Sequence, residues 1–116
     1  MTIQEVAAEL KIDLNVELAR YSGNQALYLK FLKDFPNDTS FSLLRQAMAD
    51  RKHEEIERSA HALRQNAFKL GLEELYRSSS EIVEAVRQQE PQQLPRLFQQ
   101  TSKIYDHTVE MIQELA

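Results

Sequence analysis

The chain contains no cysteine, no tryptophan, only two glycines and only three prolines among its 116 residues. The absence of cysteine excludes disulfide bonds, thiolate metal sites and cysteine nucleophiles. No apolar run reaches the roughly 18 residues of a membrane span, and the first residues lack the basic-then-apolar pattern of a signal peptide. We therefore expect a cytoplasmic protein that is neither exported nor inserted in a membrane.

The sequence also lacks an excess of basic residues. It has 14 Lys and Arg against 18 Asp and Glu, a formal net charge of −4. A general nucleic-acid binder needs a basic surface that displaces counterions, so nucleic acid is not an expected partner. There is no glycine-rich phosphate loop, no His-Glu-x-x-His motif and no Gly-x-Ser-x-Gly motif.

Helix-forming residues dominate what is present, and no alternating β-branched run predicts a strand. Thr2 and Glu5 have the spacing of a capping box, and Asp13 is placed to cap a second short helix. Asn24 follows a Ser-Gly turn and is placed to cap the next helix. Pro36 then predicts a kink or short break over residues 35–39, because proline removes a backbone donor.

Three longer segments follow. Helical periodicity predicts a helix over residues 53–70 that ends at Gly71, then a second helix, then a last helix whose first turn holds Pro91. Short connections between long helices imply antiparallel neighbours. We predict an all-α single domain over residues 1–116: an antiparallel four-helix bundle with its core at about residues 24–115 and one or two short N-terminal helices.

His61 is the residue whose neighbours suggest chemistry. At about 100° per residue it lies roughly 140° from Ile56, which starts the apolar stripe of its helix, so the imidazole is expected to face water. Arg58 lies one turn before it and Arg64 one turn after it. A neutral imidazole has a lone pair for nucleophilic attack, and a phosphoryl group attached there could pair with either guanidinium. A solvated helix face with no special role is the plainer interpretation.

The other histidines suggest less. His53, Glu57 and His61 are spaced four residues apart, but the outer two are about 12 Å apart along the helix axis, so one ion cannot easily bind all three. We expect no metal site. His53 and His107 are expected to be ordinary surface residues.

The stretch His61-Ala62-Leu63-Arg64-Gln65-Asn66-Ala67-Phe68-Lys69-Leu70-Gly71 resembles the histidine-containing phosphotransfer (HPt) domain of bacterial two-component phosphorelays. The family pattern begins with a phosphoacceptor histidine. A lysine follows three residues later, a glycine comes directly after that lysine, and a second glycine lies ten residues beyond the histidine. Residues that match are His61, Leu63, Gly71 and Leu75. The segment from Ser22 to Phe35 also resembles the family's turn and the start of its long second helix.

The sequence departs from this pattern at two positions. Arg64 replaces the usual lysine, which keeps the charge but exchanges a point charge for a planar fork. Gln65 replaces the usual glycine, one turn from the histidine. Its amide would either obstruct a docking partner or hydrogen-bond the imidazole or its phosphate.

The resemblance implies a phosphocarrier without kinase activity of its own. His61 would accept a phosphoryl group from the aspartate of one receiver domain and pass it to the aspartate of another. Arg64, Arg58 and Lys69 would offset phosphate charge, and Ala62, Gln65 and Phe68 would contact the receiver.

The implied partners are response-regulator receiver domains or a hybrid histidine kinase, and the chain is expected to be monomeric. It would bind no cofactor, since the receiver would supply Mg²⁺. The alternative is a non-catalytic module of the same fold that binds a receiver or kinase without carrying phosphate.

Overall fold

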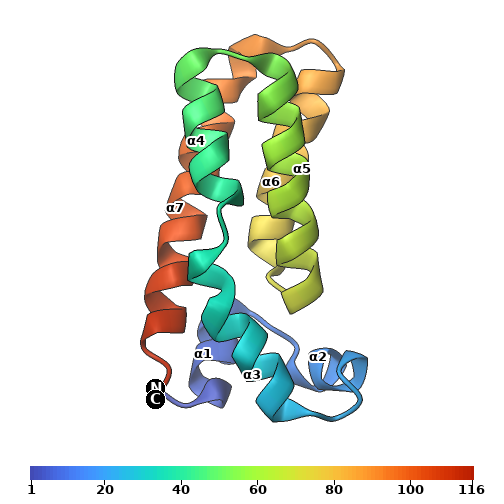
Figure 1. Cartoon of the computed structure of the whole chain (residues 1–116), viewed down its shortest axis with the longest axis vertical. Coiled ribbons are helices and arrows are strands. Elements are labelled where there is room, and N and C mark those ends of the chain that lie inside the picture. Colours follow the sequence, from blue (N-terminus) through green and yellow to red (C-terminus); the bar gives the residue numbers. More distant parts are fainter.

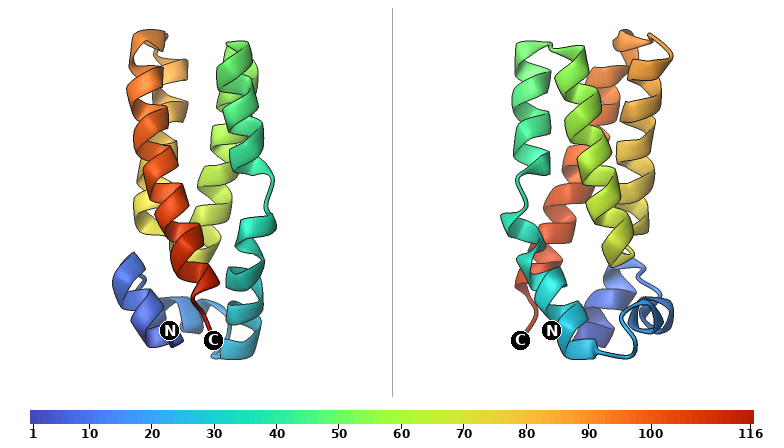
Figure 2. Two further views of the ribbon diagram at one scale, coloured as in Figure 1. Left: turned by 90° about the vertical axis from the view of Figure 1, so that its left-hand side faces the viewer. Right: turned by 45° about the vertical axis from the view of Figure 1, so that its right-hand side comes forward.

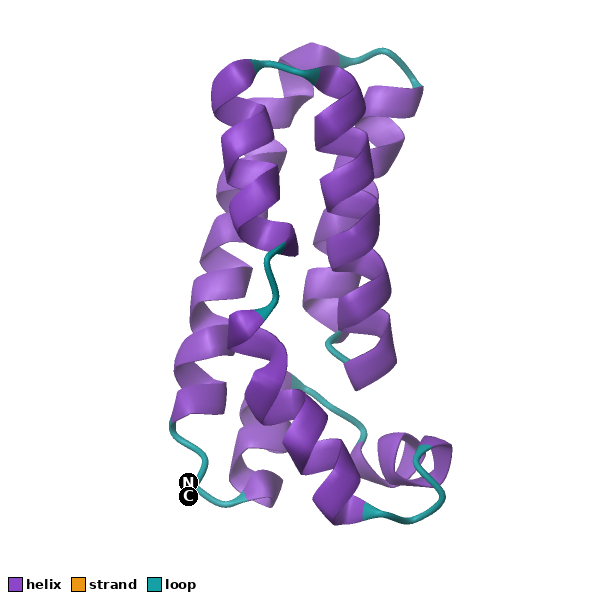
Figure 3. Cartoon of the chain, viewed as in Figure 1, coloured by secondary structure: helices purple, strands orange, loops and turns teal.

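The computed structural model describes all 116 residues, and all of its regular structure is helical (Figure 3). The prediction of an all-α chain that opens with two short helices is therefore confirmed. In chain order the elements are α1 (Ile3–Leu10), α2 (Leu14–Arg20), α3 (Gln25–Asp34), the 3₁₀ turn η1 (Phe35–Asn37), α4 (Ser40–Asp50), α5 (His53–Leu70), α6 (Glu73–Arg87), the 3₁₀ turn η2 (Pro91–Gln93) and α7 (Leu94–Gln113).

Local caps begin the first three helices where the sequence predicts. Thr2 and Glu5 form the reciprocal capping box of α1. The Asp13 side chain accepts a hydrogen bond from the Val16 amide at the start of α2, and the Asn24 side chain does the same for Leu27 in α3. Each cap satisfies a backbone donor that has no partner within its helix.

The predicted break at Pro36 is also present. Helix α3 ends at Asp34, and Pro36 lies in η1. The Asp38 carboxylate then accepts a hydrogen bond from the Ser40 amide, where α4 begins. Asn66 of α5 donates to both Asp38 and the Ser40 hydroxyl, the latter at 3.2 Å. These hydrogen bonds fasten the interruption between α3 and α4 to α5.

Helices α4, α5, α6 and α7 run side by side with successive reversals of direction, while α1, α2 and α3 lie at the opposite end from the α4–α5 corner (Figures 1 and 2). The molecule measures 41 × 24 × 20 Å along its principal axes. Its two ends meet, and the Met1 amino group donates to the Glu114 carbonyl oxygen at 2.6 Å. None of the helices combines the length and the apolar character that a membrane span requires.

An apolar core runs along the inside of these helices. Phe41 of α4 stacks on Phe98 and Tyr105 of α7, with ring centroids 5.6 Å and 4.1 Å apart. Ile56 and Leu63 of α5 are fully enclosed, as the helical periodicity predicts. The side of α5 away from this stripe is left at the surface.

Candidate functional site

His61 lies midway along α5 and is half-buried, so it does not stand free in water as the helical angle alone suggested. Its Nδ1 is buried and makes no hydrogen bond. No protein group bonds Nε2 either, and Nε2 is not among the enclosed atoms. Solvent therefore reaches the ring at Nε2. One nitrogen of the imidazole is thus enclosed and the other is open to solvent.

A shallow hollow of about 400 Å³ opens beside this ring. Of the seven predicted site residues, five lie together in it, and α6 adds one more. Its lining is His61, Arg64, Gln65, Phe68, Lys69 and Tyr76. We call this the His61 hollow. It contains no carboxylate, and neither Arg64 nor Lys69 forms an ion pair.

The other two predicted site residues, Arg58 and Ala62, lie elsewhere on α5. They line a separate hollow of about 430 Å³ on the side that faces α4. Arg58 is exposed and its guanidinium is 3.8 Å from the Glu55 carboxylate. An exposed ion pair of this kind contributes little stability, but it gives Arg58 a partner outside the His61 hollow.

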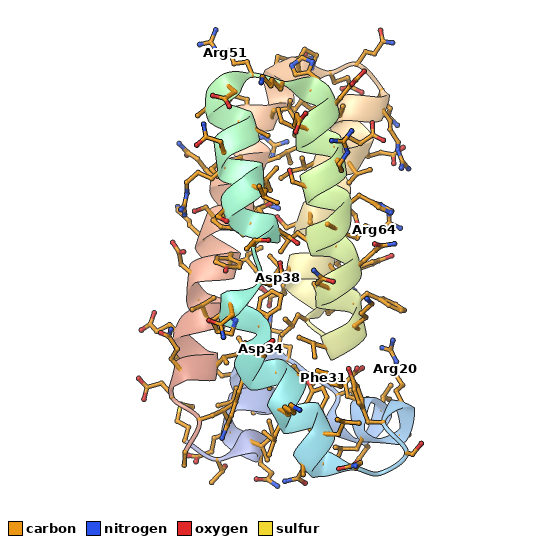
Figure 4. The ribbon with its side chains drawn as sticks, viewed as in Figure 1. Arg20, Phe31, Asp34, Asp38, Arg51 and Arg64 are labelled. Atoms are coloured by element: carbon orange, nitrogen blue, oxygen red, sulfur yellow. The ribbon has the colours of Figure 1, made fainter.

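Tyr76 and Arg20 are the neighbours that the sequence did not reveal. The Phe68 and Tyr76 ring centroids are 5.5 Å apart. The Arg64 guanidinium carbon lies 5.3 Å from the Tyr76 centroid, and that of Arg20 lies 4.6 Å from the Phe68 centroid. We call this row Arg20-Phe68-Tyr76-Arg64 the arginine–aromatic stack. Figure 4 shows that Arg20 extends from α2 toward the C-terminal end of α5. Arg64 lies on the same side, nearer the middle of α5.

Side chains from α2, from α3 and from the turn between them donate hydrogen bonds to the last carbonyl groups of α5. Arg20 donates to the Phe68 oxygen at 3.1 Å, and the Tyr21 hydroxyl donates to the Lys69 oxygen at 2.9 Å. The buried Tyr28 hydroxyl donates to the Leu70 oxygen at 2.7 Å, and burial raises its pKa. These carbonyls have no partners within α5, so the three contacts hold the end of the His61 helix in place.

Glu17 is a buried carboxylate at the same end of α5. Its Oε1 is 3.2 Å from Arg20 Nη1, so a single guanidinium joins this carboxylate to the helix C-terminus. Burial raises the pKa of Glu17, and the positive charge of Arg20 opposes that rise. Arg20 therefore neutralises negative charge that the C-terminal dipole of α5 would otherwise repel.

Replacing Arg20 by alanine is expected to lower the free energy of unfolding by about 2 kcal/mol at pH 7, because it leaves the buried Glu17 carboxylate unpaired. Since folding raises the pKa of Glu17, the native state binds the proton of this carboxyl group more tightly than the unfolded state does. Stability should then fall as the pH rises from the ordinary value of 4.5 through the raised pKa. The variant should deepen that fall, because it removes the cation that lowers the pKa.

Urea denaturation between pH 4 and pH 7 measures this effect. Glu17→Gln serves as the control, since it keeps the shape of the side chain and removes its titration. Combining Glu17→Gln with Arg20→Ala should recover part of the lost stability and flatten the pH dependence that Glu17 contributes. Equal pH profiles for the wild type and Arg20→Ala would contradict this account.

The structure gathers no three His, Cys, Asp or Glu side chains in a geometry that could hold a metal ion. Glu57 does not hydrogen-bond His61. Its carboxylate instead accepts a bond from Arg87 of α6 at 3.3 Å. His53 and His107 are both exposed, and His107 Nε2 lies 3.7 Å from a Glu9 carboxylate oxygen.

Comparisons of the chain with protein-family models, with curated proteins and with solved structures found no match.

Proposed function

We propose that this protein is a histidine phosphotransfer protein, which carries a phosphoryl group between the aspartates of receiver domains on Nε2 of His61. The observation that carries the proposal is the composition of the His61 hollow. A histidine with one reachable nitrogen lies beside Arg64 and Lys69, and no carboxylate lines the hollow or pairs with either cation. Such a site suits an anion that must bond to the ring.

The bond-making and bond-breaking steps need only the imidazole from this chain. In the tautomer with its proton on Nδ1, the Nε2 lone pair attacks the phosphorus of a receiver phosphoaspartate. An N–P bond forms while the P–O bond to the aspartyl group breaks, and that electron pair leaves on the carboxylate. In the second half-reaction another aspartate carboxylate attacks the phosphorus and the N–P electrons return to Nε2. The Nδ1 proton stays in place, so this site requires no general base.

The helix arrangement supports the proposal as well. We interpret α3 with α4 as one long helix interrupted at Pro36, which together with α5, α6 and α7 would form the four-helix bundle of the HPt family. Phe68 is 53% exposed, so it is available to a docking partner beside His61. The receiver would supply the acidic residues and Mg²⁺, and the site in this chain would supply positive charge.

Incubation with a phosphorylated receiver domain tests the proposal. The wild-type protein should acquire label that is lost in acid and kept in base, the behaviour of a phosphohistidine, and should return it to a second receiver. Binding without label would instead identify a non-catalytic module that docks a receiver or kinase. Neither labelling nor binding across the host's receivers would refute both functions.

Gln65 is expected to slow the docking step. Its side chain lies at the edge of the His61 hollow and makes no hydrogen bond to the imidazole, so obstruction is the role that the geometry favours. Gln65→Ala should raise kcat/KM for transfer by about 3-fold to 10-fold, a change of roughly 1 kcal/mol in transition-state free energy.

Alanine is the better test residue than the family's glycine, because glycine within a helix costs about 1 kcal/mol of stability relative to alanine. Gln46 of α4 is also exposed but lines the other hollow, so Gln46→Ala provides a matched control. A slower Gln65→Ala variant would mean that the amide assists the reaction.

A further inference from the structure

We infer that Tyr76 of α6 is a positioning residue that holds the Arg64 guanidinium at the His61 hollow without neutralising its charge. The inference rests on the proposed function, because it explains how the phosphate-facing cation is kept in place. Tyr76 lies twelve residues beyond Arg64 and reaches it because α5 and α6 pack side by side.

Arg64 is held by a neutral group alone. Its Nη2 lies 3.4 Å from the Tyr76 hydroxyl oxygen, and its guanidinium carbon lies 5.3 Å from the ring centroid. The other arginines of α5 and α6 have acidic partners: Arg58 pairs with Glu55, Arg77 with Glu73 and Arg87 with Glu57. Arg64 forms no ion pair, and unlike Arg58 and Arg77 it is half-buried.

A tyrosine partner has a different consequence from a carboxylate. A carboxylate at this position would compete with an incoming phosphoryl group and would repel it. The face of an aromatic ring orients a guanidinium through its quadrupole and leaves the net charge intact. The bond to the hydroxyl is long and its acceptor is uncharged, so an anionic phosphoryl oxygen, which accepts a shorter and stronger bond from a guanidinium, can replace it.

The rest of the arginine–aromatic stack keeps the Tyr76 ring in position. Phe68 packs against one side of it at 5.5 Å, and Arg20 covers Phe68 at 4.6 Å. Arg20 is itself tied to Glu17 and to the Phe68 carbonyl oxygen. The position of Arg64 is therefore linked, through two rings, to the helix that caps the end of α5.

The test compares Tyr76→Leu and Tyr76→Phe in the full-length protein. At saturating phosphorylated receiver, Tyr76→Leu should lower the transfer rate constant by about tenfold, because a displaced cation no longer meets the phosphoryl group. Tyr76→Phe keeps the ring and should lower it by about twofold to threefold. The Kd for the receiver should change by less than about twofold in Tyr76→Phe, since Phe68 keeps its neighbour.

An Arg64→Ala background shows whether Tyr76 acts through Arg64. In that background Tyr76→Leu should have no further effect on the rate constant. ¹⁵N relaxation of the Arg64 Nε group gives a readout that does not depend on phosphotransfer: it should report an ordered side chain in the wild type and a mobile one in Tyr76→Leu.

Three results would each overturn the inference. They are an unchanged rate constant in folded Tyr76→Leu, a tenfold loss that persists without Arg64, and equal mobility of the Arg64 side chain in the wild type and Tyr76→Leu. Failure of the wild type itself to accept label would refute the proposed function instead, and the relaxation measurement would still test the contact between Tyr76 and Arg64.

Discussion

Exchanging His61 for glutamine is expected to abolish acceptance of the phosphoryl group, with a loss on the order of a thousandfold or more in transfer rate. Glutamine has a similar reach but its amide nitrogen carries no available lone pair. The loss should appear in the chemical step and not in docking, because the exposed Phe68 is unchanged beside the site. Transfer of label from a phosphorylated receiver, measured alongside the receiver's Kd, separates the two.

The chain provides its own controls for this variant. His53 and His107 are exposed and lie outside the His61 hollow, so His53→Gln and His107→Gln should transfer at the wild-type rate. The three proteins should unfold within about 1 kcal/mol of one another, since the buried Nδ1 of His61 has no hydrogen bond to lose. Label on His61→Gln would place the phosphoacceptor elsewhere, and loss of label in a control would show that the effect is not specific.

Replacing Gly71 by alanine is expected to destabilise the fold by about 2–4 kcal/mol, through two separate causes. Gly71 ends α5 with φ of 75°, a left-handed conformation that costs a residue with a Cβ about 1 kcal/mol. An added Cβ would also lie 2.5 Å from Cδ of Glu17. Glu17 cannot move aside freely, because it is buried and held by Arg20.

Gly23 provides the matched control for the steric part. Its φ of 76° is nearly the same, but a Cβ there would meet nothing within 4 Å. Gly23→Ala should therefore cost about 1 kcal/mol, and the difference between the two variants in urea denaturation reports the contact with Glu17. Glu17→Ala combined with Gly71→Ala should remove that difference. Equal losses at both glycines would mean that the left-handed conformation alone decides the effect.

Features within one helix or one turn were predictable. Thr2, Asp13 and Asn24 cap their helices through contacts three residues away, and such contacts depend only on neighbours along the chain. The break at Pro36 follows in the same way from a missing backbone donor. The bounds of α5 agree with its predicted range, because its apolar stripe and Gly71 both mark them.

The composition of the site was predictable only along α5. Spacing placed Arg64 one turn from His61, and the family resemblance added Gln65, Phe68 and Lys69 to the expected site. Spacing also placed Arg58 beside His61, and the resemblance added Ala62, although these two line the hollow that faces α4. Periodicity identifies the apolar stripe of a helix. It does not show which part of the polar face a neighbouring helix will cover.

The sequence by itself determined the helical class, the caps of the first three helices, the break at Pro36 and the end of α5 at Gly71, because each of these depends on contacts within a few residues. It did not determine the start of the last helix, since Pro91 lies in η2 and α7 begins at Leu94. Only the tertiary structure decided that Nδ1 of His61 is covered, that Tyr76 holds Arg64, and that Arg20 joins Glu17 to the end of α5. Arg20 and Phe68 are 48 residues apart in the chain. Contacts of that range exist only after the helices pack, because their geometry depends on which faces the core brings together.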